Sequence, residues 1–322
     1  MKYACLFPGQ GSQVVGMGKA LAETFPESRA VFDQADRLLG FSISSMCFDG
    51  PQETLTATSN AQPAILTASI AAWEVLKKMG IRPAAVAGHS LGQYTALVAA
   101  QSLTFEEAVR VTRRRGEYME QAVNGAMAAI LGLDRAALEA LCQRVVSPEV
   151  ADVANFNSPD QIVISGSVNG VRQVCDWVKA ETKSKAIPLN VSGAFHSRLM
   201  TAAKEGLRQT LEKTVIQSPV IPVVNNVTGD FVSVPAEILE TLMIQVMKPV
   251  LWEQSIRRML ADGIDTFIEV GPGRVLSGLI RRIDRTAKTY QVEDPKGIED
   301  VSSQLGLNST FHIPHSTLAK GG

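Results

Sequence analysis

A serine occupies the centre of the segment 88–92, Gly-His-Ser-Leu-Gly, which has the spacing of a nucleophile turn. The apolar run 84–87 precedes this segment and a helix-forming run, 94–100, follows it. A strand, a sharp turn and a helix in that order lift a serine hydroxyl clear of its own backbone, where it can attack an acyl carbon. The two glycines tolerate the tight turn. The pattern therefore predicts that Ser90 is a nucleophile in acyl chemistry.

A serine nucleophile needs a base to remove its proton, and the chain has only four histidines. His89 adjoins Ser90, so the two side chains point apart, and we expect His89 to pack beneath the turn. His312 and His315 lie in a poorly patterned tail. His196 lies where a helix is expected to begin. A lone histidine is usually a structural residue, but elimination favours His196 as the base.

A third catalytic group, an acid between the serine and the histidine, would complete a hydrolase triad. The carboxylates in that interval all fall within elements of their own small unit, where helix caps and solvated faces explain them; they include Asp134, Asp152, Asp160 and Asp176. We therefore expect a Ser–His dyad whose imidazole is oriented by a neutral acceptor, such as a backbone carbonyl.

The elements that must position these residues alternate between strands and helices, which predicts an α/β protein. Residues 2–7 read as a buried strand, followed by a glycine-rich loop, 7–13, of the kind that lies at the carboxyl edge of an open parallel sheet. Helices are expected at about 26–39 and about 61–79, the second with Pro63 in its first turn. A further helix, capped by Thr104, runs to about Val123.

A unit of shorter elements interrupts this pattern between residues 125 and 192. Its order, strand–helix–strand–strand–helix–strand, is that of the ferredoxin-like unit. We therefore expect three parts: a large domain from 1–124 and 193–290, a ferredoxin-like subdomain over 125–192, and a C-terminal segment, 291–322, that reads as a tail from about 300.

Composition limits the function classes. The 322 residues are 45% hydrophobic with a formal net charge of −1, which is typical of a soluble globular protein and does not suggest nucleic-acid binding. No run is apolar enough for a signal peptide or a membrane span, so we expect a cytoplasmic protein, and we expect a monomer. The four cysteines lack paired spacing, which argues against a zinc site or disulfides; they are Cys5, Cys47, Cys142 and Cys175.

Six motifs together resemble the malonyl-CoA:acyl-carrier-protein transacylase family and cover the chain from residue 2 to about 290. They are Phe7-Pro8-Gly9-Gln10-Gly11-Ser12-Gln13, the serine turn with Tyr94, Arg115-Gly116, Asn157-Ser158-Pro159 with Gln161, Ala194-Phe195-His196-Ser197, and Glu269-Val270-Gly271-Pro272-Gly273. The resemblance implies an α/β-hydrolase-like core with a parallel sheet and a ferredoxin-like insert. It also implies transfer of malonyl from malonyl-CoA to an acyl carrier protein, without a metal or a redox cofactor.

The resemblance further implies a role for each matching residue of the reaction centre. Ser90 corresponds to the acylated nucleophile, and His196 to the general base and then general acid. Gln245 matches a glutamine whose main-chain carbonyl holds the histidine ring. The backbone N–H groups of Gln10 and Leu91 would form the oxyanion hole. From the sequence alone, Gln10 would be an ordinary turn residue.

Substrate selection is likewise implied by the match. The third arginine in a row on a helix is most often solvated, but Arg115 corresponds to the residue that binds the malonyl carboxylate. Phe195, which could equally be a core aromatic, would exclude a methyl branch at the acyl α-carbon. Asn155 and Asn157 are candidate pocket residues. Gln93 departs from the glutamate that the family commonly has after the turn, which puts in doubt whether charge is needed there.

The expected reaction is a ping-pong transfer in which malonyl passes from CoA to Ser90 and then to the phosphopantetheine thiol of the carrier. Four basic residues are candidates for docking an acidic carrier protein: Lys183, Lys185, Arg281 and Arg282. We expect a role in fatty-acid synthesis. The alternatives are a stand-alone acyltransferase of polyketide synthesis, a hydrolase of the same architecture, and a carrier-binding module without chemistry.

Overall fold

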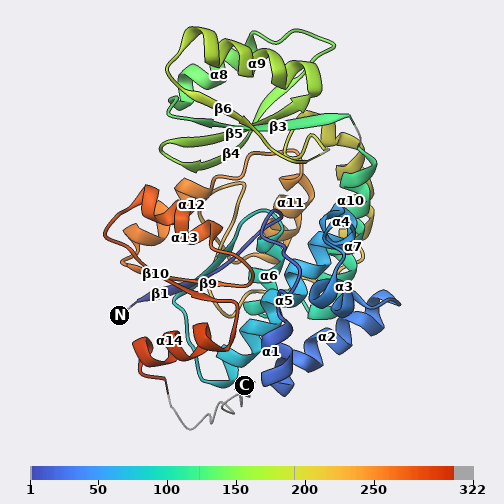
Figure 1. Cartoon of the computed structure of the whole chain (residues 1–322), viewed down its shortest axis with the longest axis vertical. Coiled ribbons are helices and arrows are strands. Elements are labelled where there is room, and N and C mark those ends of the chain that lie inside the picture. The colour runs from blue at the N-terminus through green and yellow to red at the C-terminus, as the bar shows by residue number, and fades with distance from the viewer. Residues whose placement is uncertain (1, 123, 192, 308–322) are drawn as a thin grey trace, which may run out of the picture.

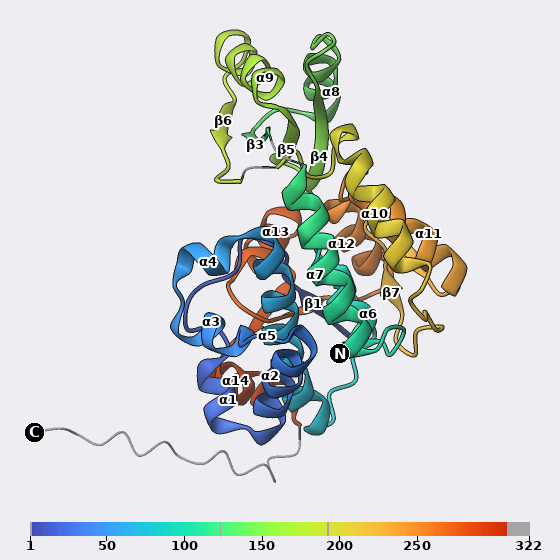
Figure 2. The ribbon, with the colours of Figure 1, turned by 90° about the vertical axis from the view of Figure 1, so that its right-hand side faces the viewer.

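The computed structural model describes residues 2–122, 124–191 and 193–307, which form two lobes. A large lobe is built on a six-stranded mixed sheet, and a smaller lobe stands above it on a separate four-stranded antiparallel sheet (Figure 1). A view from the side shows α8 (Arg135–Gln143) and α9 (Val168–Glu181) at the outer end of the small lobe. They lie far from the helices α1 (Lys19–Thr24) and α2 (Pro26–Leu39) (Figure 2). The α/β class expected from the sequence is confirmed.

The large sheet has the strand order β10-β9-β1-β2-β7-β8. All neighbouring strands are parallel except the last pair, β7 and β8. The sheet is therefore mixed at one edge rather than wholly parallel as expected. Its strands are β1 (Tyr3–Phe7), β2 (Ala85–Gly88), β7 (Val223–Val224), β8 (Phe231–Val232), β9 (Thr266–Val270) and β10 (Lys288–Val292).

Alternation along β1 explains how both faces of this sheet are covered. Cys5 and Phe7 belong to one buried cluster, and Ala4 and Leu6 to another, because successive side chains of a strand point to opposite faces. The second face packs on α12 (Trp252–Ala261) and α13 (Val275–Ile283). On the first face, the helices in contact with the strands are α5 (Thr58–Lys78), α6 (Gly92–Ala99) and α14 (Pro295–Leu305). The buried cluster of this face extends outward to α1 (Lys19–Thr24), α2 (Pro26–Leu39), α3 (Ile43–Asp49), α4 (Gln52–Thr56), α7 (Phe105–Gln121), α10 (Thr201–Leu211) and α11 (Pro235–Gln245).

The small lobe follows the order β3, α8, β4, β5, α9, β6, with the strands arranged β4-β5-β3-β6 in the sheet. One face of this sheet packs on the two helices, and side chains of the other face, including Met127 and Val163, join the main cluster of the large lobe. The elements are β3 (Gly125–Leu131), α8 (Arg135–Gln143), β4 (Ala151–Ser158), β5 (Gln161–Ser167), α9 (Val168–Glu181) and β6 (Lys185–Pro188).

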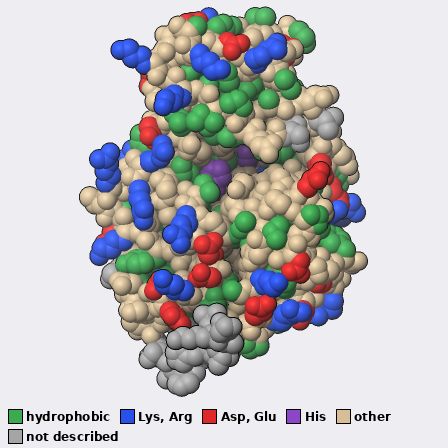
Figure 3. Space-filling view, in the orientation of Figure 1, with side chains coloured by type: hydrophobic (Ala, Val, Ile, Leu, Met, Phe, Trp, Pro, Cys, Tyr) green, Lys and Arg blue, Asp and Glu red, His purple; other side chains and the backbone are tan. Residues whose placement is uncertain are grey.

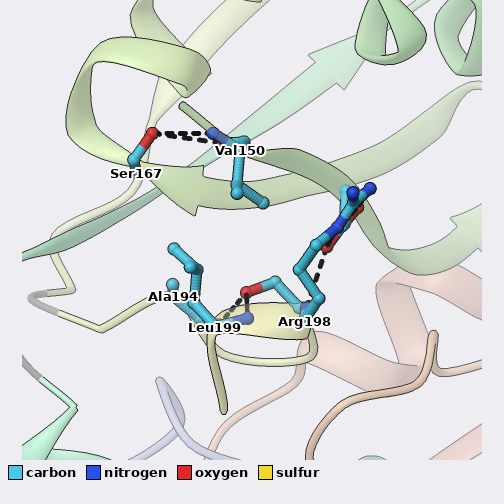
Figure 4. Close-up of polar contacts among 7 residues, drawn as sticks. Val150, Ser167, Ala194, Arg198 and Leu199 are labelled. Atoms are coloured by element: carbon cyan, nitrogen blue, oxygen red, sulfur yellow. Dashed lines mark hydrogen bonds and ion pairs between the residues drawn. The ribbon is translucent and has the colours of Figure 1, made fainter. Parts of the chain in front are cut away.

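Backbone hydrogen bonds join the two lobes directly. The N–H of Phe156 in β4 donates to the carbonyl of Val250 over 2.9 Å, and the N–H of Val250 donates to the carbonyl of Ala154 over 2.9 Å. Arg198, which opens the short 3-10 helix Arg198–Met200 of the large lobe, donates through its side chain to Asp152 of β4 (Figure 4). The small sheet is therefore fixed against the segment just after α11.

Two local expectations differ from the structure. The helix α5 begins at Thr58, three residues before the expected start, so Pro63 lies in its second turn. Residues 300–305 are not a tail: they belong to α14, whose Ile298 and Val301 are fully buried. The histidines His312 and His315 lie outside the described residues. None of the helices in the described ranges combines the length and apolar character needed to cross a bilayer.

Candidate active site

The serine turn connects β2 to α6, and its backbone is strained. Ser90 has φ 51°, in the left-handed region that a serine rarely adopts. A Cβ at Gly88 would lie 1.8 Å from the carbonyl oxygen of Gly92, and a Cβ at Gly92 would lie 2.1 Å from that of Phe7. Only glycine fits at both positions, so the two glycines of the segment permit a turn that presents the Ser90 hydroxyl above the sheet.

Ser90 and His196 form a hydrogen-bonded pair, with 2.7 Å between Ser90 Oγ and His196 Nε2. The other ring nitrogen, Nδ1, lies 2.8 Å from the carbonyl oxygen of Gln245 and 3.1 Å from that of Lys248. A carbonyl can only accept, so Nδ1 carries the proton and Nε2 is free to accept the proton of Ser90. The sequence suggested one backbone acceptor for this ring, and the structure places two there.

His196 is held in its neutral form, which is the form that can accept a proton. Burial and the nearby charge of Arg115 lower the pKa of His196 to about 3, so the ring is neutral at physiological pH. The residue lies in a loop whose backbone is fixed: its N–H donates to Val246 O over 2.9 Å, and Ser197 Oγ donates to Ala194 O over 2.7 Å. Figure 4 shows Ala194 in this loop and Leu199 in the 3-10 helix that follows it.

Arg115 is a buried cation with no acidic partner among the described residues. The residue is only 1% exposed, and burial lowers its pKa. Its Nη1 donates to Gln62 Oε1 over 2.8 Å, while Nη2 donates to Ser90 Oγ over 3.1 Å and to Gln245 Oε1 over 3.2 Å. Its Nε has no partner, and within the described ranges no carboxylate pairs with the guanidinium. An uncompensated buried guanidinium beside a nucleophile is suited to a substrate carboxylate.

Two backbone N–H groups near the nucleophile have no acceptor in the part of the chain that the structure describes. Neither Gln10 nor Leu91 donates its amide proton to an acceptor among the residues that the structure describes. The loop that carries Gln10 lies directly against the serine turn, because a Cβ at Gly9 would lie 2.5 Å from the carbonyl oxygen of His89. Leu91 follows the nucleophile, which is the usual place of one oxyanion donor.

A cavity of about 730 Å³ opens above these groups, between the lobes. Figure 3 shows histidine side chains at the base of this hollow, with hydrophobic side chains around it. Ser90, His196 and Phe195 line the cavity, as do Asn155 and Asn157 of β4. Phe195 is only 6% exposed and its ring packs on Gly193, where a Cβ would lie 2.2 Å from it. Six of the nine site residues predicted from the sequence line this cavity: Gln10, Ser90, Asn155, Asn157, Phe195 and His196. The other three adjoin Ser90, since Leu91 follows it in the chain and both Arg115 and Gln245 are hydrogen-bonded to it.

The remaining candidates of the sequence occupy structural positions. His89 hydrogen-bonds through Nε2 to Asn157 Oδ1 over 2.9 Å and contacts the Trp252 ring, so it supports the turn. Asp134 caps α8, accepting from Ala137 N over 3.0 Å, and Asp152 pairs with Arg198. Asp160 pairs with Arg282, one of the four docking candidates. The other three are exposed and have no ion pair in the described ranges; they are Lys183, Lys185 and Arg281.

The sequence analysis did not identify three residues that contribute to the site. Gln62 orients Arg115, Asn226 contacts the backbone of Ser90, and Lys248 supplies its carbonyl to His196. Gln62 directly precedes the apolar run 63–66 of α5, and Asn226 follows β7 at the carboxyl edge of the sheet, so both carried a recognisable signal. A carbonyl acceptor such as Lys248 carries no side-chain signal at all.

The acyl transferase domain family matches residues 4–301. The chain is 49% identical over 302 residues to the malonyl CoA-acyl carrier protein transacylase of Bacillus subtilis, covering 92% of this chain and 95% of that one. It is 40% identical to a polyketide biosynthesis malonyl CoA-acyl carrier protein transacylase of the same organism, covering 88% and 97%. A solved structure of a malonyl-transacylase with a type II polyketide acyl-carrier protein matches with a TM-score of 0.92 and 37% identity, covering 94% and 100%.

Proposed function

The chain belongs to the acyl transferase family, among its malonyl-CoA:acyl-carrier-protein transacylases, and from that premise we propose how this site transfers malonyl. The observation that carries the proposal is the buried Arg115, free of any acidic partner in the described ranges and 3.1 Å from Ser90 Oγ. A malonyl group has a free carboxylate that can pair with the guanidinium, which places the thioester carbon beside the serine. An acetyl group has none.

The proposed first half-reaction loads the enzyme. Neutral His196 accepts the proton of Ser90 at Nε2 while Nδ1 stays bonded to the Gln245 carbonyl. Ser90 Oγ bonds to the thioester carbon, and the oxygen of the resulting tetrahedral intermediate accepts from the N–H groups of Gln10 and Leu91. The C–S bond then breaks, His196 returns the proton, and CoA leaves as the thiol.

The proposed second half-reaction reverses these roles. His196 takes the proton of the carrier's phosphopantetheine thiol, the sulfur attacks the malonyl ester, and Ser90 is released with its proton restored. The wide cavity between the lobes gives both thiols access to the same carbon. No step uses a metal or a redox cofactor, and we predict that a chelator leaves the rate unchanged.

Transfer, hydrolysis and binding without chemistry are separated by one experiment. Enzyme mixed with malonyl-CoA alone should gain the mass of one malonyl group on Ser90, stable until carrier protein is added and then lost to it. Rapid loss to water would support the hydrolase alternative, and an enzyme that never gains the mass would overturn the proposal. Ser90→Ala is the control.

We propose further that the carrier protein is one of fatty-acid synthesis, since the polyketide-labelled relative is the less similar of the two Bacillus proteins. Docking would use the exposed cations Lys183, Lys185 and Arg281, together with Arg282, against an acidic carrier. Charge reversal at all four should weaken carrier binding and leave CoA unaffected. Equal rates with carriers of both pathways would contradict the pathway proposal.

For the architecture, we propose that the small lobe is a ferredoxin-like subdomain inserted in an α/β-hydrolase-like core; its element order supports this. A cytoplasmic monomer remains our expectation from the sequence, and light scattering of the purified protein tests the oligomeric state.

A further inference from the structure

Two side-chain amides hold the backbone of the nucleophile. Asn226 Oδ1 accepts from Ser90 N over 2.7 Å, and Asn226 Nδ2 donates to Gly88 O over 2.7 Å. Gln245 Nε2 donates to Ser90 O over 3.1 Å and to Asn226 Oδ1 over 3.2 Å. Asn226 is fully buried and Gln245 is 1% exposed. Both the N–H and the C=O of Ser90 are thus held from segments more than 130 residues away in sequence.

The left-handed conformation of Ser90 requires such support. A non-glycine residue at φ 51° is costly and persists only where its surroundings determine it. The hydrogen bond at the carbonyl has a further effect, because Ser90 C=O and Leu91 N–H belong to one planar trans peptide and point in opposite directions. A donor that fixes the Ser90 oxygen therefore also fixes the direction of the Leu91 N–H.

We propose that Asn226 and the side chain of Gln245 are positioning residues that together hold the Leu91 N–H on the oxyanion. This rests on the proposed function, and it gives Gln245 a second task besides the carbonyl that orients His196. The Gln245 side chain also accepts from Arg115 Nη2 over 3.2 Å. One side chain therefore connects the oxyanion donor to the cation that receives the substrate.

The test compares Asn226→Ala with Asn225→Ala. Asn225 is an equally buried amide one residue earlier. Its side chain is hydrogen-bonded to Thr241 Oγ1 over 2.6 Å and to Val227 N over 2.7 Å, and not to Ser90. Both variants lose a buried amide, so both should lower the melting temperature. Only Asn226→Ala should slow the loading of malonyl on Ser90, by about a hundredfold in rate constant, with KM for malonyl-CoA within about threefold of wild type.

Gln245→Met provides an independent variant on another segment, which keeps the side-chain volume and the main-chain carbonyl. It should also slow loading by about tenfold or more. The double variant should lose little beyond the worse single one, since the two amides are hydrogen-bonded to each other and hold the same residue, Ser90. Loading rates of Asn226→Ala and Gln245→Met equal to that of Asn225→Ala would overturn the inference alone. Wild-type enzyme that never acquires malonyl would overturn the proposed function as well.

Discussion

Replacing Arg115 by methionine removes the buried cation while keeping an unbranched side chain of similar length. Truncating one partner of a buried charge pair costs roughly 2–5 kcal/mol, so kcat/KM for malonyl-CoA should fall about 30- to 5,000-fold. Acetyl-CoA offers no carboxylate to Arg115, and its slow transfer should change little or increase. The ratio of the two rates therefore reports directly on the pairing.

The same substitution should alter the base. Hydrogen bonds of 3.1 and 2.7 Å through the Ser90 hydroxyl connect Arg115 Nη2 to His196 Nε2, so these nitrogens lie within about 6 Å. At an effective dielectric constant of about 20, a unit charge at about 6 Å opposes protonation by about 3 kcal/mol, equivalent to about two pH units. The pKa of His196, about 3 in the wild type, should therefore rise in Arg115→Met.

Nuclear magnetic resonance titration of the His196 ring and transfer assays with both acyl-CoAs measure these effects. Because only the neutral ring can accept a proton, the acidic limb of the loading rate should move to higher pH in Arg115→Met. The control is Arg114→Met, since Arg114 is exposed on the same helix and pairs with Glu117 over 2.8 Å. Equal losses for malonyl and acetyl, or an unchanged titration of His196, would refute the reasoning.

Three further substitutions test other parts of the site. Phe195→Leu should raise methylmalonyl transfer relative to malonyl by about tenfold or more, measured by competition, because it removes a ring that lines the cavity. Gln93→Glu should retain kcat within about threefold, since Gln93 Oε1 accepts from Asn226 N and Gln245 Nε2 over 3.0 Å each, whereas its Nε2 has no partner in the described ranges. Glu269→Gln should destabilise α13, where Glu269 accepts from Leu276 N and Ser277 N. Burial raises the pKa of Glu269, so the contribution of this carboxyl to stability declines as pH rises above its ordinary value of 4.5. The difference in free energy of unfolding between wild type and variant, measured by urea unfolding, should therefore narrow over that range.

The nucleophile and the base could be found from the sequence because their side chains limit the choices. A serine between two glycines after an apolar run has few structural explanations, and only four histidines compete for the base. Arg115 and Gln10 were different. Their residue types suggest a solvated face and a turn, and only the family resemblance gave them roles, since long-range packing decides that Arg115 is 1% exposed.

The features that the sequence analysis did not predict were overlooked for physical reasons. The helix α14 is polar on most of its surface and contributes only two fully buried residues, so its apolar pattern is too sparse to be read beyond residue 300. The antiparallel edge of the large sheet arises from strands of two residues, β7 and β8, which are too short to show alternation. Asn226 acts on a backbone 136 residues away, a contact that no local pattern encodes.

The backbone bridge between β4 and Val250 has a consequence for engineering this enzyme. Val250 stands two residues after Lys248, whose carbonyl holds the catalytic ring, and it is paired with Ala154 and Phe156 of the small sheet. In a chimera that exchanges the small lobe alone, residues of another protein would replace Ala154 and Phe156 at this junction. The position of Lys248, and with it the orientation of the His196 ring, would then change. Recombination intended to change acyl preference should therefore transplant 154–156 and 245–251 as one cassette.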